Sequence, residues 1–364
     1  MKYLLITTSS RSVINFRSSF IKHLKEKNNE IVVISQDDEM KNEIEKKDVK
    51  FYCVKGNNRS LNPFKMFNSI KQYKSIILSE KPDYVLTYQL KPNTFGVLAA
   101  KKAKITKIYP MVEGLGDVFI NNTFKWKVIR FVVCKLYKKA FKNANKVFFL
   151  NNDDKNEFID RKLVKKEQCI VIPGIGVDTE KFAYKPLKNY NVFLMVARML
   201  KTKGVMEYCE AARQVKKVYP EAVFNYLGAE GNIKISDIQE YIDDGSINYL
   251  GLTNDVRPYL EECSMFVLPS YYREGLPMSI MEAMSVGRGI ITTDNVGCRE
   301  TVENEVNGYL ISKENIVEDL KNTVFHILKN RGTTENFSMQ SRRTAEDKFC
   351  ERIINKNIYY ILEN

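Results

Sequence analysis

Histidine is scarce in this sequence: His23 and His326 are the two among 364 residues. A zinc site or a Ser-His-Asp triad needs histidine together with further ligands or partners. The two histidines are far apart in the sequence, and each lies in a polar, helix-like stretch. We therefore expect packing or surface roles for both, and the scarcity argues against metal or triad chemistry.

Paired cysteines are also missing. The seven cysteines are an odd number, are spread along the chain and form no C-x-x-C motif. Disulfide frameworks and zinc sites usually show even numbers or close spacing. The sequence therefore predicts reduced thiols in a cytoplasmic protein. These residues are Cys53, Cys134, Cys169, Cys209, Cys263, Cys298 and Cys350.

Long hydrophobic runs are absent as well. Runs such as Phe131–Val133 and Val147–Leu150 are far shorter than the ~20 residues that span a bilayer. The N-terminal stretch "MKYLLITTSSRS" contains no small-residue cleavage site. We interpret it as a first β-strand and not as a secretory signal.

The net charge of +13 is unevenly distributed. Residues 1–180 contain 34 Lys and Arg against 19 Asp and Glu, whereas the rest of the chain contains 23 against 25. The first half is thus at +15 and the second at −2. Such an imbalance favours contact between the first half alone and an anionic surface.

Short β-branched or aromatic runs alternate with helix-length segments along the whole chain. This alternation predicts an α/β protein with parallel sheets covered on both faces. We expect two Rossmann-like domains facing a central cleft, residues 1–172 and 173–345. A helix over Thr344–Asn364 would let residues 346–364 pack back on the first domain. The expected strands are Tyr3–Thr7, Ile31–Ser35, Phe51–Val54, Tyr84–Thr87, Ile108–Val112, Val147–Leu150, Ile170–Ile172, Phe193–Val196, Val223–Leu227, Ile247–Leu250, Met265–Leu268, Ile290–Thr293 and Tyr309–Ile311.

Glycine does not occur before Gly56, so the loop after the first strand, "TTSSRSVINFR", cannot contain the G-x-G-x-x-G fingerprint. This weakens a dinucleotide-binding interpretation based on NAD or FAD.

The stretch "YYREGLPMSIMEAMSVG" (Tyr271–Gly287) places Glu274 directly before a tight turn and Glu282 in the following helix. We expect a helix over Pro277–Gly287, with Pro277 in its first turn and Gly287 as its C-terminal cap. Its N-terminal end would face an anion such as a diphosphate. Carboxylates on either side could accept hydrogen bonds from the two sugars of a nucleotide sugar. The alternative is a solvated Glu274 and an ordinary Glu282.

A second motif, "MVARMLKTKG" (Met195–Gly204), follows another expected strand. Arg198 and Lys203 could bracket a diphosphate, Arg198 with its forked guanidinium and Lys203 as a point charge. The alternative is an ordinary basic loop.

Together, the Arg198–Lys203–Gly204 spacing and the Glu274–Glu282 pair resemble the retaining GT-B glycosyltransferases of family 4. "PGIGVDTEKF" and "GCRETVENEVNGYLI" look like that family's nucleotide-binding domain. "SLNPFK" (Ser60–Lys65), "LKPNTFGVLAAKKAKI" and "MVEGLGDVF" are similar to bacterial members that extend polyprenyl-diphosphate-linked oligosaccharides. The resemblance covers nearly the whole chain.

The resemblance implies roles for individual residues. Arg198 and Lys203 would hold the donor diphosphate as catalytic groups. Glu274 would contact the transferred hexose, and Glu282 the ribose. Many members carry a histidine near Thr87–Lys91, whose role would fall to Lys91 or Asn93 here. The remaining substrate-binding residues implied are Gly275, Leu276, Pro277, Met278, Gly251, Val256, Glu113, Gly114, Gly116 and Arg17.

The resemblance also implies the reaction. It predicts transfer of N-acetylgalactosamine from a UDP donor, in α linkage, to an undecaprenyl-diphosphate-linked saccharide at the cytoplasmic membrane face. No Asp-x-Asp motif is present near these residues, so we expect no metal ion and no other cofactor. The alternatives are a hexosyl- or HexNAc-transferase of capsule or O-antigen synthesis that uses another UDP- or GDP-sugar, and a sugar-nucleotide epimerase or hydrolase of the same fold.

The densest basic segment is "FKWKVIRFVVCKLYKKAFKNANK" (Phe124–Lys146). Apolar residues recur at helical spacing with lysines between them, which predicts a helix that packs inward and presents its lysines to an anionic bilayer. The alternative is an ordinary amphipathic helix with a solvated face. Nucleic acid could use the same charge, but no nucleic-acid motif accompanies it, so we expect no nucleic-acid partner.

Overall fold

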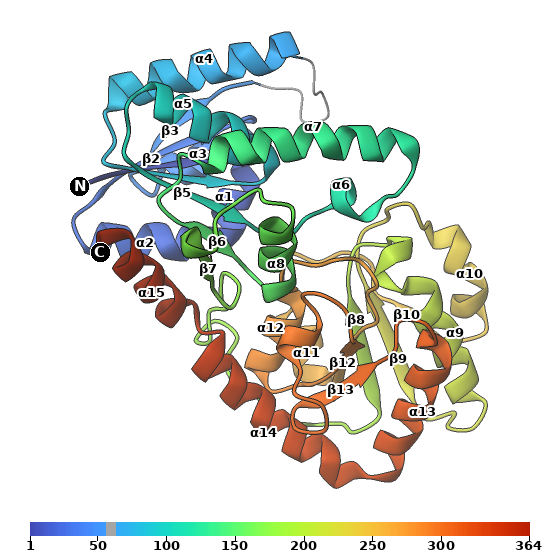
Figure 1. Cartoon of the computed structure of the whole chain (residues 1–364). Coiled ribbons are helices and arrows are strands. Elements are labelled where there is room, and N and C mark those ends of the chain that lie inside the picture. Colours follow the sequence, from blue (N-terminus) through green and yellow to red (C-terminus); the bar gives the residue numbers. More distant parts are fainter. Residues whose placement is uncertain (56–62) are drawn as a thin grey trace. The chain divides into compact units, whose positions relative to one another are not determined.

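The computed structural model describes residues 1–55 and 63–364, without the side chains of residues 63–67 and 117. It divides into two compact units, Met1–Ile175 with Arg352–Asn364 and Gly176–Glu351 (Figure 1). Each unit is built around its own parallel β-sheet with helices on both faces, so the predicted α/β fold is confirmed. The motif Ser60–Lys65 lies in part outside the described residues.

The sheet of the first unit has seven strands in the order β3-β2-β1-β4-β5-β6-β7. Its strands are β1 Lys2–Ile6, β2 Glu30–Ser35, β3 Lys50–Cys53, β4 Tyr84–Tyr88, β5 Lys107–Val112, β6 Val147–Phe149 and β7 Cys169–Val171. Its helices are α1 Ser10–Phe16, α2 Ser18–Glu26, α3 Lys41–Glu45, α4 Pro63–Glu80, α5 Val97–Lys102, α6 Asp117–Ile120, α7 Phe124–Phe141, α8 Asn152–Asp160 and α15 Glu351–Glu363, and a π-helical turn covers Pro92–Gly96.

Strand β1 shows why these runs form a sheet that is buried on both faces. Successive side chains of a strand point to opposite faces. Accordingly, Leu4 and Ile6 belong to one core cluster. Tyr3 and Leu5 belong to another. Apolar residues at successive positions therefore suit a strand that is covered on both sides.

The last helix, α15, covers one face of the first unit's sheet. Ile354, Ile358 and Leu362 share a core cluster with residues of β1. The hydroxyl of Tyr109 donates to the carbonyl of Leu362 at 3.4 Å. The prediction of one continuous helix over Thr344–Asn364 was wrong, because the segment contains the end of one helix and the whole of another.

The break falls at Phe349 and Cys350, between α14 (Arg331–Lys348) and α15. The carbonyl of Phe349 accepts from the N–H of Val177 at 2.8 Å, and the N–H of Glu351 donates to the carbonyl of Val177 at 3.0 Å. These backbone groups are bonded to a neighbouring segment, and the α-helix is interrupted there.

The sheet of the second unit has six strands in the order β10-β9-β8-β11-β12-β13. The strands are β8 Val192–Val196, β9 Val223–Leu227, β10 Asn248–Tyr249, β11 Met265–Leu268, β12 Gly289–Thr293 and β13 Gly308–Ile311. The remaining helices are α9 Val205–Lys216, α10 Ile235–Asp243, α11 Arg257–Glu262, α12 Met278–Val286, α13 Ile316–Lys329 and α14.

Both sheets contain a point where the strand order changes direction. In the first unit it lies between β1 and β4, and in the second between β8 and β11. The loops that leave two such strands turn to opposite faces, which opens a crevice at the carboxyl edge where ligands of α/β proteins bind. The loops after these strands are therefore the expected place of a ligand site.

Histidine and cysteine take structural places. The ring of His23 meets Tyr359 edge-on at 5.6 Å, and that of His326 meets Tyr309 at 5.9 Å, in keeping with the expected packing roles. All seven cysteines are free thiols. Within the described part of the chain, no helix combines the length and apolar character needed to cross a membrane.

Candidate functional site

The loop after β8 carries Arg198 and Lys203. Lys203 ends a 3-10 turn and precedes Gly204, which has a left-handed φ of 77°. A Cβ atom at Gly204 would lie 2.2 Å from the carbonyl oxygen of Pro269. Glycine is therefore required here because the loop after β8 passes directly against the loop after β11.

This close approach brings Lys203 to Glu274. The two side chains form an ion pair, and they are 20% and 12% exposed. The buried hydroxyl of Ser270 donates to Oε1 of Glu274 at 2.9 Å. The structure thus joins the two motifs predicted from separate stretches of sequence, at the switch point between β8 and β11. Arg198, by contrast, is exposed.

The backbone of Glu274 is held from the other side by the loop after β12. The N–H of Glu274 donates to the carbonyl of Val296 at 3.2 Å. Gly297 has a φ of 83°, and a Cβ atom there would lie 2.5 Å from the carbonyl oxygen of Glu274. The amide of Asn295 donates to the carbonyl of Tyr272 at 2.7 Å. Three loops therefore fix the position of this carboxylate.

Helix α12 follows through Gly275, Leu276 and Pro277. The prediction that Pro277 lies in the first turn was wrong, because its ψ of 115° is extended and the helix begins at Met278. Gly287 ends the helix with a φ of 83°, as predicted. The first N–H groups of α12 have no acceptor within the helix, and together with the helix dipole they favour an anion at this end.

Glu282 lies in the second turn of α12. Burial withholds water from its carboxylate and raises the pKa of Glu282 to about 7, against a small opposing effect of Lys181. A carboxyl group with this pKa changes its charge close to neutral pH. In its ionised form both oxygens act only as acceptors, whereas the protonated form also carries an O–H donor.

The loop after β10 carries Gly251 and Val256. Gly251 has a φ of 77°, and its carbonyl accepts from the N–H of Gly228 at 2.8 Å. Val256 caps the N-terminus of α11. Between them, Leu252 is 74% exposed. An exposed leucine in this loop offers an apolar surface for the flat face of a base.

In the first unit, the loops after β1, β4 and β5 are joined by one polar network. Nε2 of Gln89 donates to Glu113 at 2.8 Å, and Thr7 donates to Oε1 of Gln89 at 2.8 Å. Arg17 forms an ion pair with Glu113 and lies 3.9 Å above the ring of Tyr88. The ends of three strands and the junction of α1 and α2 thus converge at the switch point of the first unit.

Two glycines of the loop after β5 follow this network. Gly114 and Gly116 have φ values of 143° and 62°, which L side chains rarely adopt. The loop leads into α6 and α7.

Two family models match this chain. One, described as glycosyl transferase 4-like, matches residues 3–151, and one described as glycosyl transferases group 1 matches residues 176–344. A Campylobacter jejuni enzyme, N,N'-diacetylbacillosaminyl-diphospho-undecaprenol alpha-1,3-N-acetylgalactosaminyltransferase, is 32% identical over 95% of this chain and 94% of its own. The chain belongs to the glycosyltransferase family of this enzyme, with a glycosyl transferase 4-like part followed by a group 1 part.

Further comparisons agree with this assignment. An Escherichia coli UDP-Gal:alpha-D-GlcNAc-diphosphoundecaprenol alpha-1,3-galactosyltransferase is 30% identical over 71% of this chain and 70% of its own. The crystal structure of Anabaena Alr3699/HepE with UDP and glucose superposes with a TM-score of 0.82 over 100% of both chains, at 17% identity. The fold is therefore GT-B, as predicted, and the chain is a nucleotide-sugar-dependent glycosyltransferase.

The structure separates the two candidates for the histidine role in this glycosyltransferase. The amide of Asn93 donates to the carbonyl of Met111 at 2.7 Å and accepts from Thr87 at 2.7 Å, and its side chain is buried. Asn93 therefore ties β4 to β5, which disfavours the predicted contact with substrate. Lys91 is buried in the first unit, and burial lowers its pKa.

Two residues of the candidate site were not predicted from the sequence. Ser270 orients Glu274, and Gln89 connects Thr7 with Glu113. A serine after a buried strand is too common to attract notice. Gln89 has a φ of 65°, an unusual backbone conformation for glutamine that the sequence does not reveal.

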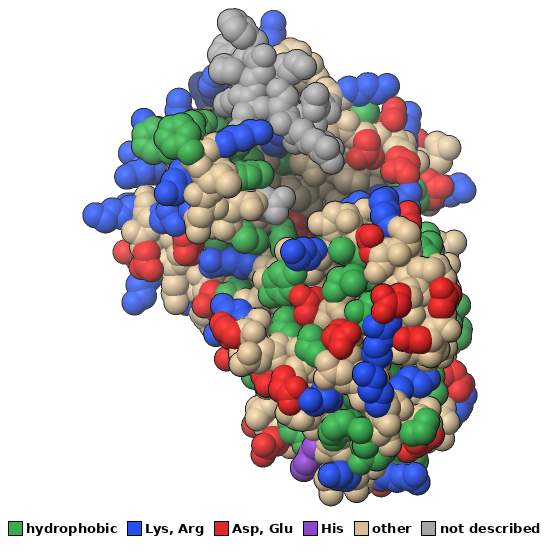
Figure 2. Space-filling model, turned by 90° about the vertical axis from the view of Figure 1, so that its right-hand side faces the viewer, with side chains coloured by type: hydrophobic (Ala, Val, Ile, Leu, Met, Phe, Trp, Pro, Cys, Tyr) green, Lys and Arg blue, Asp and Glu red, His purple; other side chains and the backbone are tan. Residues whose placement is uncertain are grey.

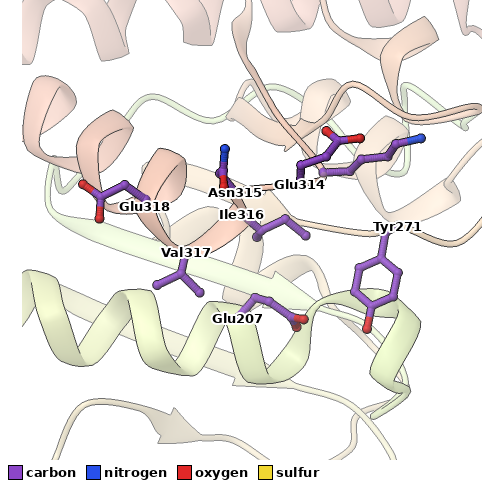
Figure 3. A pocket seen from close by; sticks show the side chains of 8 residues that line it. Glu207, Tyr271, Glu314, Asn315, Ile316, Val317 and Glu318 are labelled. Carbon is purple, nitrogen blue, oxygen red and sulfur yellow. The ribbon is translucent and has the colours of Figure 1, made fainter.

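A cavity of about 640 Å³ lies beside this site in the second unit. Figure 3 shows the carboxylate of Glu207, on α9, and the ring of Tyr271 facing each other across it. Burial, with a contribution from Glu207, raises the pKa of Tyr271. The other lining residues, Lys313–Glu318, form the end of the loop before α13 and the first turn of that helix. None of the predicted site residues lines this cavity. One of its lining residues, Tyr271, is bonded to the loop that carries Lys203, because its backbone N–H donates to the carbonyl of Thr202 at 3.0 Å.

Proposed function

We propose that this glycosyltransferase moves N-acetylgalactosamine from UDP-N-acetylgalactosamine to a polyprenyl-diphosphate-linked saccharide, with retention and in α linkage. The similarity to the Campylobacter enzyme over 95% of the chain carries this proposal. The name of the Escherichia coli relative also contains a diphosphoundecaprenol-linked acceptor. The acceptor's lipid, and the basic first half of the chain, support work at the inner face of the cell membrane.

The Lys203–Glu274 pair supports different roles for basic and acidic residues in binding the donor. Lys203 and Arg198 stabilise the negative charge that develops on the departing diphosphate, and the N-terminal end of α12 adds its dipole. Glu274 accepts a hydrogen bond from the transferred sugar, and Glu282 accepts from the ribose. The exposed Leu252 borders the base.

The chemistry needs no nucleophile from the protein. The bond between the anomeric carbon and the phosphate oxygen breaks, the acceptor oxygen attacks from the same face, and its proton passes to the departing phosphate oxygen. The products are a glycoside and UDP. Glu274 is ill suited to covalent attack because its carboxylate is already bonded to Lys203 and Ser270.

Lys91 and the network around Glu113 form the acceptor side of the proposal. Glu113 and the backbone at Gly114 and Gly116 contact the acceptor saccharide, and the ion pair with Arg17 holds Glu113 in place. Lys91 contributes positive charge for the acceptor diphosphate. Lys91 is thereby assigned the role of the histidine that many family members carry near Thr87–Lys91.

A panel of UDP- and GDP-sugars with a polyprenyl-diphosphate saccharide tests the function, with nucleotide release and glycolipid product both measured. Turnover confined to UDP-N-acetylgalactosamine with acceptor supports the proposal. Glycolipid formed from another sugar would assign a different hexosyl- or HexNAc-transferase. Lys203→Ala and Glu274→Ala should each lower turnover at least ~100-fold, whereas near-normal rates would remove the site assignment.

One observation favours hydrolysis as a second candidate. The pKa of about 7 for Glu282 is the kind of value that suits a general acid. Release of UDP at equal rates with and without acceptor, and no glycolipid, would establish that activity instead.

A further inference from the structure

Helix α7 presents two different surfaces on its outer side. Its inner side packs into the core of the first unit through Val133, Tyr137, Ala140 and Phe141, as predicted for the apolar stripe. Its outer side, which was predicted to present lysines, also carries apolar residues. Four apolar residues are exposed in the first half of the helix, Phe124 by 83%, Phe131 by 61%, Val128 by 49% and Val132 by 40%.

These four residues form one ridge. They stand at positions i, i+4, i+7 and i+8, which lie on the same side of an α-helix. The second half of the same side is basic, with exposed lysines at 135, 138, 139 and 142. Nζ of Lys135 lies 4.3 Å from the centre of the Phe131 ring, where the two halves meet. Figure 2 shows exposed hydrophobic side chains beside Lys and Arg side chains at its upper left.

An apolar ridge next to a row of lysines is complementary to the surface of an anionic bilayer, which offers acyl chains and phosphate groups side by side. Apolar side chains gain from burial at the boundary of the acyl chains, and lysines gain from nearby phosphates. The segment Phe124–Lys146 contains no acidic residue that would oppose such a surface. A protein partner with an acidic patch would suit the lysines, but it leaves two exposed phenylalanines without a reason.

The helix is also fixed to the acceptor side of the candidate site. Nε of Arg130 donates to the carbonyl of Val118 at 2.8 Å, and its NH2 group donates to the carbonyl of Asn121. These carbonyls belong to α6 and the turn after it, which follow the loop of Glu113, Gly114 and Gly116. A helix that rests on lipid would therefore hold this loop next to the membrane.

We propose that α7 binds anionic membrane by inserting the ridge Phe124, Val128, Phe131 and Val132 among the lipids, while the lysines that follow contact phosphates. The proposal deepens the function proposed above and rests on its lipid-linked acceptor. It assigns the binding to two separable parts, an apolar one and an ionic one.

Flotation with vesicles of phosphatidylcholine containing about 30% phosphatidylglycerol, which supplies the anionic surface, tests both parts. Phe124→Ser/Phe131→Ser should lower the partition coefficient at least about tenfold, at low salt and in 1 M NaCl alike. Lys138→Ser/Lys139→Ser should lower it about thirtyfold at low salt, at ~1 kcal/mol for each lysine, and hardly at all in 1 M NaCl.

The matched control is Val218→Ser/Met339→Ser, which removes two apolar side chains of the second unit that are 60% and 59% exposed. It should partition like the unchanged protein, and all variants should keep the same far-UV circular dichroism and Tm. A Phe124→Ser/Phe131→Ser variant that partitions normally, or a wild-type protein that stays unbound, would overturn the proposal. The proposal would also be overturned if light scattering showed that the wild-type protein is a dimer, and if Phe124→Ser/Phe131→Ser were monomeric but floated like wild type.

Turnover with a water-soluble, short-chain polyprenyl-diphosphate saccharide separates this proposal from the function itself. The Phe124→Ser/Phe131→Ser variant should turn over this acceptor within about twofold of wild type, because the acceptor needs no membrane. If wild type transfers no sugar to it, the proposed function fails while the vesicle result stands. If the variant alone loses turnover, the ridge serves the site directly and membrane insertion is refuted.

Discussion

The titration of Glu282 gives a sharp test of its contact with the donor. Its pKa of about 7 arises from burial, so the carboxyl is roughly 9% ionised at pH 6 and 91% ionised at pH 8. If the ionised form alone accepts hydrogen bonds from both ribose hydroxyls, donor affinity should weaken about tenfold from pH 8 to pH 6. Glu282→Gln should remove this dependence, because the amide does not titrate.

Calorimetric titration with UDP-N-acetylgalactosamine measures the effect, since its diphosphate has no proton to gain in this range. Wild type should show the tenfold change, and Glu282→Gln should bind weakly at both pH values. Glu221→Gln, an exposed change in the same unit, should behave as wild type. A flat wild-type profile, or an equal slope in Glu282→Gln, would refute the reasoning.

The same shift predicts the stability of the second unit. The pKa of Glu282 is higher in the folded state than the usual 4.5, so ionisation of this residue destabilises the fold. The cost is absent below about pH 4.5, grows as the pH rises towards 7 and is complete above it, at no more than about 3 kcal/mol. Glu282→Gln should therefore become more stable than wild type as the pH rises from 5 to 8.5 in urea unfolding followed by circular dichroism. Equal unfolding midpoints at pH 8.5 would contradict the assigned burial.

Three other expectations follow from the structure. Gly204→Ala should lower the Tm by at least about 4 °C, because its Cβ atom would lie 2.2 Å from the carbonyl oxygen of Pro269; an unchanged melting curve would show that the loops separate easily. Asn93→Ala should destabilise the protein by about 1–3 kcal/mol in urea unfolding, while kcat/KM per folded molecule stays within threefold. Lys91→Ala should keep the stability and lower kcat/KM for the acceptor at least tenfold. The opposite pattern would show that Asn93, and not Lys91, contacts the substrate. Turnover should survive EDTA, because Arg198 and Lys203 supply the positive charge; loss of activity that Mg²⁺ restores would show that a metal ion takes part.

The strands were predictable from the sequence because each is a short run of apolar residues between polar segments. Val223–Leu227 and Met265–Leu268 were predicted with their observed bounds, and the other strands within one or two residues. Helix boundaries were harder to predict. The break after Lys348 depends on backbone hydrogen bonds to Val177, a residue distant in sequence.

The candidate site was predictable in its charged residues but not in their partners. Lys203 and Glu274 stood out because each follows a strand and lies beside a glycine turn. Their ion pair depends on how two loops approach, which the contact of Gly204 with Pro269 determines. The exposed ridge of α7 was not predicted, because helical spacing alone does not show which apolar residues the core leaves uncovered.

The packing of α15 on β1 has a consequence for biosynthesis. Residues 352–364 complete the apolar core around Tyr3 and Leu5, yet about 190 residues must be translated after Ile175 before the last of them emerges. At roughly 5–20 residues per second, the ribosome leaves that face of the nascent first unit bare for about 10–40 s. The apolar face of β1 therefore stays exposed, or is covered by a chaperone, until α15 has been synthesised.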